Sequence, residues 1–158
     1  MPSLPSSPRS IELDLISHAK KLKIEPRENE VNHLWCPIRR IWLSIQPEEI
    51  VRQSVIHFLM EEHNISRGRI GVEKGFKVNG RLKRFDVVVF DRDGLPLLLV
   101  ECKAPEVAVN QTLFDQLSTY NRELRAKWLW ATNGRVNYIC QTNKKGRLSF
   151  SNSFPNFE

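Results

Sequence analysis

The stretch "DVVVFDRDGLPLLLVECKAP", Asp86 to Pro105, decides the fold. It contains two apolar runs with the length and composition of buried strands, separated by the turn signal "RDG". A tight turn between consecutive strands makes them antiparallel neighbours. The start of the first strand therefore lies beside the end of the second, which brings Asp86 next to Glu101.

The carboxylates at this sheet edge are unusual in a core strand. Side chains alternate along a strand, so Glu101 and Lys103 face one side while Val100 and Cys102 face the other. Two carboxylates in a half-buried site repel each other unless one pKa rises or a cation lies between them, and removing either one should leave stability unchanged or higher. Mg²⁺ suits such a site, with the Cys102 carbonyl as a further ligand. The alternative is a salt bridge at the strand end, joining Glu101 to Lys103 or Asp86 to an arginine.

Further elements extend on both sides of this hairpin. The run "RIGVEKGFKV" precedes it across an "NG" turn signal, which predicts three consecutive antiparallel strands. Upstream, "QPEEIVRQSVIHFLMEEH" predicts a helix that begins at Pro47, with Glu48 and Glu49 near the positive end of its dipole. Downstream, apolar residues recur at helical spacing from Asn110 to Arg125. A helix of that length serves as a crossover, which would set the following strand, "KWLWATNG", parallel to the third.

The remaining segments complete one α/β domain. "IRRIWLSI", Ile38 to Ile45, is strand-like, and residues 11 to 34 are expected to be irregular with a short helix or strand. "VNYICQT" and "RLSF" are expected to be late strands. Residues 1–10 read as a flexible tail and residues 11–158 as a single domain.

The amino-acid composition narrows the classes of partner and compartment that the chain suits. Lys and Arg number 24 against 18 Asp and Glu, a formal charge of +6, which favours nucleic acid as a partner, although ordinary solubility explains the charge equally well. No segment approaches the roughly 20 apolar residues of a membrane span, and the scattered cysteines suit a reducing cytoplasm. One group of polar residues around the first helix and the hairpin would track a phosphate backbone, unless it is a solvated face: Arg52, Gln53, Arg69, Lys74, Lys77, Arg81, Lys83 and Arg84.

Three motifs together resemble those of the PD-(D/E)xK nucleases. "RFD", "VECK" and "QLSTY" match the RecB-like variety, which adds Gln-x-x-x-Tyr. "PEEIVRQ", "FDQLSTYN" and "ATNG" further resemble the N-terminal nuclease domain of the R subunit of type I restriction enzymes. The resemblance runs from about Arg40 to Tyr138.

The resemblance implies a restriction-endonuclease-like αβββαβ core, with a central mixed sheet flanked by helices. It implies a DNA phosphodiester hydrolase, an endonuclease or exonuclease of restriction, defence or repair type, that depends on Mg²⁺ or Mn²⁺. It also implies roles for individual residues. Asp86, Glu101 and Glu49 would be metal ligands, with Glu48 as the second choice on the helix, Lys103 would be the catalytic lysine, and Gln116 and Tyr120 would face the metal centre or DNA phosphates.

Alternatives stand beside these roles. Glu48 and Glu49 also suit simple dipole partners, and Tyr120 also suits a core aromatic. The chain has no G-x-x-x-x-G-K-[ST] loop, so the ATP-driven motor of the R subunit does not carry over. The alternative function is a catalytically silent module that binds nucleic acid or docks a partner. Besides DNA, the expected partners are a second copy of the chain or a subunit of a restriction system.

Overall fold

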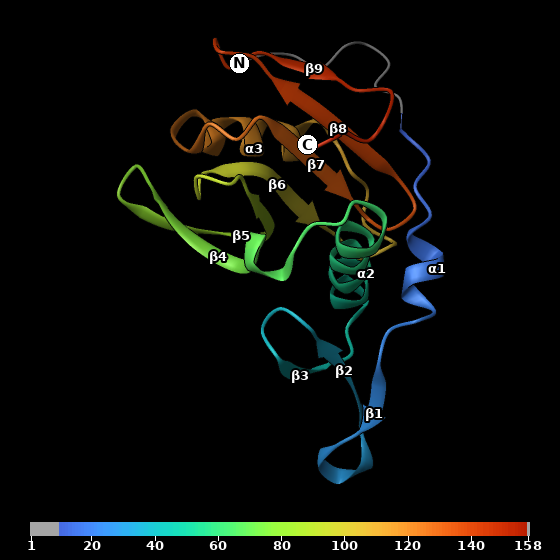
Figure 1. Ribbon diagram of the computed structural model, residues 1–158. Helices are drawn as coiled ribbons and strands as arrows, with labels where there is room; N and C mark the ends of the chain where they lie inside the picture. Colours follow the sequence, from blue (N-terminus) through green and yellow to red (C-terminus); the bar gives the residue numbers. More distant parts are fainter. Residues whose placement is uncertain (1–9, 158) are drawn as a thin grey trace.

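A computed structural model describes residues 10–157, and residues 1–9 and 158 lie outside it. The chain is a mixed α/β structure in which a six-stranded mixed sheet has helices on both faces, and a smaller three-stranded sheet projects beside the body (Figure 1). The tail expected over residues 1–10 falls almost wholly outside the described residues. Only its last residue is described: the Ser10 hydroxyl accepts a hydrogen bond from the Asn137 N–H at 3.0 Å.

The helices and strands follow the order that the sequence predicts from residue 47 onward. The first part of the chain forms α1 (Leu15–Ala19), β1 (Ile24–Pro26), the 3-10 turn η1 (Glu28–Glu30), β2 (Asn32–Cys36) and β3 (Ile41–Ser44). The rest forms α2 (Pro47–Glu62), η2 (Arg67–Arg69), β4 (Ile70–Val78), β5 (Arg81–Phe90), β6 (Pro96–Cys102), α3 (Gln111–Leu124), β7 (Trp128–Thr132), β8 (Asn137–Thr142) and β9 (Leu148–Phe150).

The main sheet has the strand order β4-β5-β6-β7-β8-β9. Strands β4, β5 and β6 pair antiparallel, and β7 pairs parallel to β6 after the α3 crossover. The topology predicted from the two turn signals and the crossover helix is therefore confirmed. At the "NG" turn, Asn79 and Gly80 have φ angles of 51° and 75°, which fit the two-residue hairpin loops that join twisted strands.

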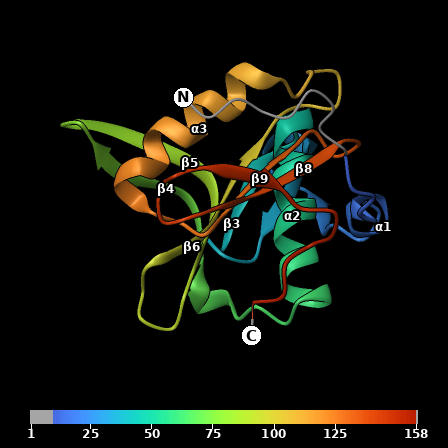
Figure 2. The same cartoon turned by 90° about the horizontal axis from the view of Figure 1, so that it is seen from above.

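Helices α2 and α3 cover opposite faces of the main sheet (Figures 1 and 2). Helix α2 buries Val51, Val55 and Leu59 in the core that also contains Val100 and Cys102. Helix α3 buries an equivalent apolar stripe in the core on the other face, which contains Leu99. Adjacent residues of β6 thus point to opposite cores, as strand alternation requires. The α3 residues of this stripe are Leu113, Phe114 and Leu117.

The small sheet forms where the sequence predicts mostly irregular structure. Strands β1, β2 and β3 pair antiparallel, and the predicted strand from Ile38 to Ile45 is shortened to Ile41–Ser44. Strand β2 anchors this sheet, since Leu34 and Cys36 are fully buried. Strands of three to five residues carry too few alternations for a period-two pattern to stand out, which is why the sequence does not reveal them.

The alternation of β5 breaks at Asp86. The pairing of β4 with β5 matches Val72 to Val87 and Lys74 to Phe85, with no pair between Glu73 and Asp86. Phe85 and Val87 are two residues apart, yet Phe85 lies in the α3-side core and Val87 in the α2-side core. Glu73 adopts a left-handed backbone with φ 50° opposite this point. Local irregularities of this kind re-aim side chains in sheets, and here the side chain that is re-aimed is Asp86.

Over residues 10–157, no helix combines the length and the apolar character that crossing a membrane demands.

Candidate functional site

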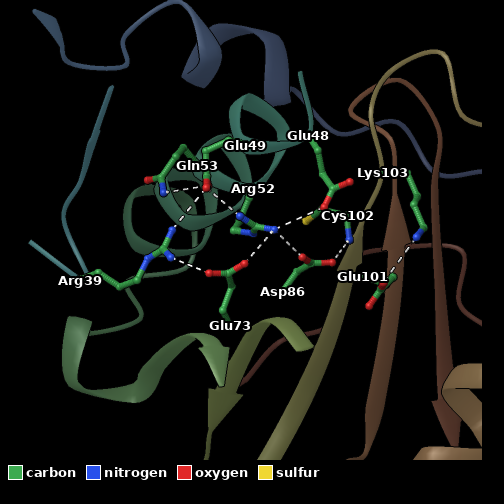
Figure 3. A network of polar contacts seen from close by, with 10 residues as sticks. All are labelled: Arg39, Glu48, Glu49, Arg52, Gln53, Glu73, Asp86, Glu101, Cys102 and Lys103. Carbon is green, nitrogen blue, oxygen red and sulfur yellow. Dashed lines mark hydrogen bonds and ion pairs between the residues drawn. The ribbon is translucent and has the colours of Figure 1, made fainter. Parts of the chain in front are cut away.

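Two adjacent strands bring together the carboxylates that the sequence singles out. Asp86 lies on β5, and its Oδ2 accepts a hydrogen bond of 2.8 Å from the backbone N–H of Cys102, next to Glu101 on β6 (Figure 3). The Lys103 ammonium lies 3.6 Å from Glu101 Oε1. The hairpin register therefore gathers all three groups at one edge of the sheet, as predicted.

The buried carboxylate of Glu101 lacks a hydrogen-bond partner for one of its oxygens. Its side chain is only 14% exposed, and Oε2 is buried without a hydrogen-bond partner. Burial, together with the negative charge of Asp86, raises the pKa of Glu101 to about 7, and the nearby Lys103 offsets only part of this effect. A buried carboxylate oxygen with no donor is expensive, so this position is short of positive charge.

Asp86 is in the opposite situation, because Arg52 of α2 already pairs with it. Arg52 Nη2 lies 2.7 Å from Asp86 Oδ1, and Nη1 lies 2.7 Å from Glu49 Oε1. Burial disfavours the guanidinium charge, but the contacts with Asp86 and Glu49 outweigh it and hold the pKa of Arg52 above its usual value. This ion pair also reverses the expected effect on stability of removing Asp86, because the buried Arg52 would lose its partner.

The assignment of Arg52 and Gln53 to a surface that tracks phosphates is wrong. Both residues are buried, with exposed fractions of 6% and 0%. Gln53 donates a 3.3 Å hydrogen bond to Glu49 Oε2 instead of facing solvent. Both side chains bind carboxylates at the site, and we call this group the acidic network. Its carboxylates are Glu48, Glu49 and Asp86. The periodicity of α2 hides this, because polar residues on a surface helix normally face outward.

The two glutamates at the start of α2 take different positions. Glu49 is buried, and its carboxylate is bound by Arg52, Gln53 and Arg39, the last at 3.3 Å. Glu48 is about half exposed, and Figure 3 shows its carboxylate on the Cys102 side of Arg52, whereas Glu49 lies on the Gln53 side. The charge of Glu48 also helps to raise the pKa of Glu101. Of the two, Glu48 is therefore placed beside the strand carboxylates, and the ligand role of Glu49 stays a prediction.

Two further residues complete the network, and sequence reasoning missed them. Glu73 on β4 pairs with Arg39 at 2.7 Å and lies 3.7 Å from Arg52. Arg39 is in the turn between β2 and β3, so the small sheet contributes to the site. No sequence signal points to Glu73, because its position depends on the left-handed backbone that interrupts the pairing of β4 with β5.

A cavity of about 580 Å³ opens beside this network. Its lining includes Glu48, Glu49 and Arg52 of α2, together with Ala104, which follows Lys103 directly. The cavity therefore gives access from solvent to the side of α2 that faces the end of β6. A substrate group entering here would reach the acidic network from the Glu48 side.

The residues of the Gln-x-x-x-Tyr motif lie on α3, which covers the face of the sheet opposite α2. Leu99 lies in the core on this face, and Glu101 shares that face by strand alternation. Gln116 is exposed. Tyr120 is half-buried: its ring meets Phe85 edge-on at 6.2 Å, and Lys83 Nζ lies 4.9 Å from its centre. The positive charge of Lys83 in turn acts on Glu101 and lowers its pKa. Tyr120 is thus partly a packed aromatic, as the alternative interpretation expects, and Lys83 connects it electrostatically to the site.

The oxygen atoms that the site could offer as metal ligands suit a hard divalent ion such as Mg²⁺ only in part. Among residues 10–157, no group of three or more His, Cys, Asp or Glu side chains is arranged as a ready metal centre. Mg²⁺ needs only one or two carboxylates, however, with water and substrate phosphate as its other ligands. Glu101, with its unpartnered buried oxygen, and the adjacent Asp86 meet that requirement. The Cys102 carbonyl stays a predicted ligand.

The chain matches a known protein family over most of its length. The profile of the family described as the type I restriction enzyme R protein N terminus (HSDR_N) matches residues 47–155. The chain belongs to this family. The matched segment contains α2, all of the main sheet and α3, and it excludes the small sheet with Arg39.

A solved structure also resembles the chain, at low sequence identity. It is the fragment structure assigned to an HsdR subunit of a type I restriction enzyme from Vibrio vulnificus YJ016, with 23% sequence identity and a TM-score of 0.45. The similarity covers 64% of this chain and 22% of that chain. Comparison with curated proteins finds no match.

Proposed function

We propose that the chain is a Mg²⁺-dependent DNA phosphodiester hydrolase with a restriction-endonuclease-like core of the PD-(D/E)xK type, acting in restriction or defence. The observation that carries this proposal is the buried, unpartnered Oε2 of Glu101, with Asp86 and Lys103 beside it. Membership of the R-subunit N-terminal family supports DNA as the substrate and a restriction system as the setting.

In this proposal, the acidic residues would bind the ion and Lys103 would act on the water or the phosphate. Asp86 and Glu101 would hold the ion, with Glu48 as the third acid in preference to Glu49. When bound, a divalent ion polarises a phosphoryl oxygen and lowers the pKa of its water. The Lys103 side chain is 34% exposed, so its ammonium reaches solvent and can orient the attacking water or offset charge on the phosphate.

Arg52 and Glu49 would position the site instead of touching the substrate. Arg52 holds Asp86 Oδ1, while the Cys102 N–H holds Oδ2, so the Asp86 carboxylate is fixed in orientation before any ligand arrives. Glu49 in turn holds Arg52 and is itself held by Gln53. A carboxylate fixed in advance loses little entropy on binding an ion.

The contacts of Asp86 with Arg52 and Cys102 also favour one alternative function. Both oxygens of Asp86 already have a partner, which suits a catalytically silent module that binds nucleic acid while its site remains closed by Arg52. Each carboxylate oxygen has two acceptor positions, so a bound partner does not by itself exclude an ion. The two candidate functions therefore differ in whether an ion reaches Asp86 in the presence of Arg52.

A cleavage assay separates them. Supercoiled, linear duplex and single-stranded DNA are each incubated with the chain in Mg²⁺, in Mn²⁺ and in EDTA, and the products are resolved on gels. The hydrolase predicts cleavage in Mg²⁺ or Mn²⁺ and intact DNA in EDTA. Intact DNA under all three conditions, together with DNA binding in a gel-shift assay, would support the silent module instead.

A further inference from the structure

A second cavity, of about 570 Å³, lies far from the acidic network. It is formed by the C-terminal half of α3, the corner between α3 and β7, and the turn between β8 and β9, which lie side by side in Figure 2. Among the described residues, its lining includes no Asp or Glu. We call it the basic pocket, and five cations line it: Arg122, Arg125, Lys127, Lys144 and Lys145.

The basic pocket is at the opposite end of the sheet from the candidate site. Lys127 directly precedes β7, whereas Thr132 at the other end of β7 pairs with Cys102. A five-residue strand at about 3.3 Å per residue places the two regions about 17 Å apart. These cations are also separate from the basic residues of the first helix and the hairpin that the sequence analysis singles out.

The corner between α3 and β7 is rigid before any ligand binds. The buried Asn121 side chain accepts a 2.8 Å hydrogen bond from the Ala126 N–H and donates one of 2.9 Å to the Ala126 carbonyl. The Thr142 hydroxyl donates to that same carbonyl at 2.7 Å, which ties β8 to the corner. Arg125 and Lys127 flank Ala126, so their backbones are fixed by these bonds.

The turn that carries the two lysines is fixed as well. Asn143 Oδ1 accepts hydrogen bonds of 2.9 Å from the backbone N–H groups of Lys145 and Arg147. The Gly146 N–H closes the turn onto the Asn143 carbonyl at 2.9 Å. Because both walls of the pocket are pre-ordered, a ligand would pay little to organise them.

Four of the five cations of the pocket lack a carboxylate partner among the described residues. In the part of the chain that the structure describes, no ion pair involves Arg125, Lys127, Lys144 or Lys145. Glu123 on the same turn of α3 bonds instead to the Asn79 N–H of the β4–β5 hairpin, at 3.0 Å. Like charges that gather without a carboxylate raise the local potential and attract polyanions.

We infer that the basic pocket binds phosphate groups of the DNA backbone and forms a second anchor for the substrate. The inference rests on the proposed function, because it takes DNA as the ligand of this chain. In a duplex, the phosphates of one strand rise about 3.4 Å per nucleotide along the helix axis, so a 17 Å separation along that axis corresponds to about five nucleotides between the anchor and the candidate site. The anchor contacts phosphate alone, so it serves DNA of any sequence.

The test compares two double variants with the same change in charge. Lys144→Gln/Lys145→Gln removes two cations of the pocket, and Lys20→Gln/Lys21→Gln removes two exposed cations after α1 as the matched control. Binding of a labelled 30-base-pair duplex is measured by fluorescence anisotropy in EDTA over a series of salt concentrations. Each lost phosphate contact reduces the slope of log K against log salt by about 0.9. The pocket variant should lose about 2 from this slope and bind more than tenfold more weakly at low salt, while the control changes less than about threefold.

A third variant removes a pocket charge at a position where the substitution should not disturb the fold. Arg125 has a left-handed φ of 55° after the end of α3, where glycine is favoured, so Arg125→Gly removes a pocket charge from a position that suits glycine. It should weaken duplex binding and lower the slope by about 1. Equal binding by the parent and both pocket variants, or equal losses in the pocket and control double variants, would overturn the inference. So would loss of binding to inorganic phosphate or a mononucleotide with duplex binding unchanged.

The results also separate this inference from the proposed function. If the parent cleaves DNA in Mg²⁺ while the pocket variants bind duplex normally, only the anchor is wrong. If the parent binds duplex through the pocket but never cleaves it, the anchor stands and the hydrolase is wrong.

Discussion

The substitution Glu101→Gln probes the candidate site through stability alone, before any cleavage is measured. Glu101 is buried beside Asp86, and its pKa is about 7 instead of the ordinary 4.5. A group whose pKa is raised in the folded state holds its proton more tightly there than in the unfolded chain. The metal-free protein therefore keeps its full stability below pH 4.5 and loses stability as the pH rises towards 7.

The difference between the two pKa values sets the size of the effect. At about 1.4 kcal/mol per pKa unit, a fully ionised Glu101 costs the folded state about 3 kcal/mol. Glutamine keeps the shape without the charge, so Glu101→Gln should recover most of this cost at pH 8. The variant loses the 3.6 Å contact with Lys103, which is partly exposed and contributes less than about 1 kcal/mol. The net gain at pH 8 should be about 2 kcal/mol, with little change at pH 4.5.

Urea unfolding in EDTA at pH 4.5 and pH 8 measures this gain. Glu106→Gln is the matched control, because Glu106 is exposed just beyond the end of β6. The control should change by less than about 0.5 kcal/mol at either pH. If Glu101→Gln is no more stable than the parent at pH 8, or if its gain is the same at both pH values, the argument that Glu101 lacks a counter-charge is refuted.

Four other substitutions test the remaining groups. Asp86→Asn should abolish cleavage and also lower stability by about 1–3 kcal/mol in urea unfolding, because the buried Arg52 is left without the carboxylate that accepts its 2.7 Å hydrogen bond; unchanged stability would contradict the ion pair. Lys103→Ala should lose cleavage but retain Mg²⁺ binding in calorimetry, whereas loss of Mg²⁺ binding would indicate a structural pair with Glu101. Gln116→Ala should slow cleavage more than tenfold at a stability cost below about 1.5 kcal/mol, and Tyr120→Phe should be stable and slower. Normal cleavage by Gln116→Ala would mean that the Gln-x-x-x-Tyr match arose by chance.

The strand order of the main sheet could be read from the sequence because local signals determine it. Two turn signals join three apolar runs, and a helix long enough for a crossover follows them, so few topologies remain. The same register places Asp86 beside Glu101 without any knowledge of the tertiary structure. Helix α2 was equally predictable, since Pro47 marks its start and an apolar face runs along it.

The acidic network under the site could not be read in this way. Arg52 and Gln53 look like surface residues on a helical wheel, yet they are buried because Asp86 and Glu49 satisfy them. The position of Glu73 depends on a left-handed residue within β4, and Arg39 arrives from a small sheet with weak periodicity. Each of these contacts joins residues that are distant in sequence, and a pattern within one segment carries no information about them.

The basic pocket was hidden for a related reason. Its cations come from the end of α3, the residue before β7 and the β8–β9 turn, and in the sequence each looks like an ordinary charged residue near a turn. Only the packing of the α3–β7 corner against β8, through Asn121 and Thr142, brings them together.

The most direct test of the hydrolase is cleavage of DNA by four forms of the chain in Mg²⁺ and in EDTA. These forms are the parent, Asp86→Asn, Glu101→Gln and the control Glu106→Gln. The account predicts that the parent and the control cut DNA in Mg²⁺ alone, and that Asp86→Asn and Glu101→Gln do not cut although both remain folded. Cleavage by either strand variant at the parental rate, or cleavage by the parent in EDTA, would contradict it.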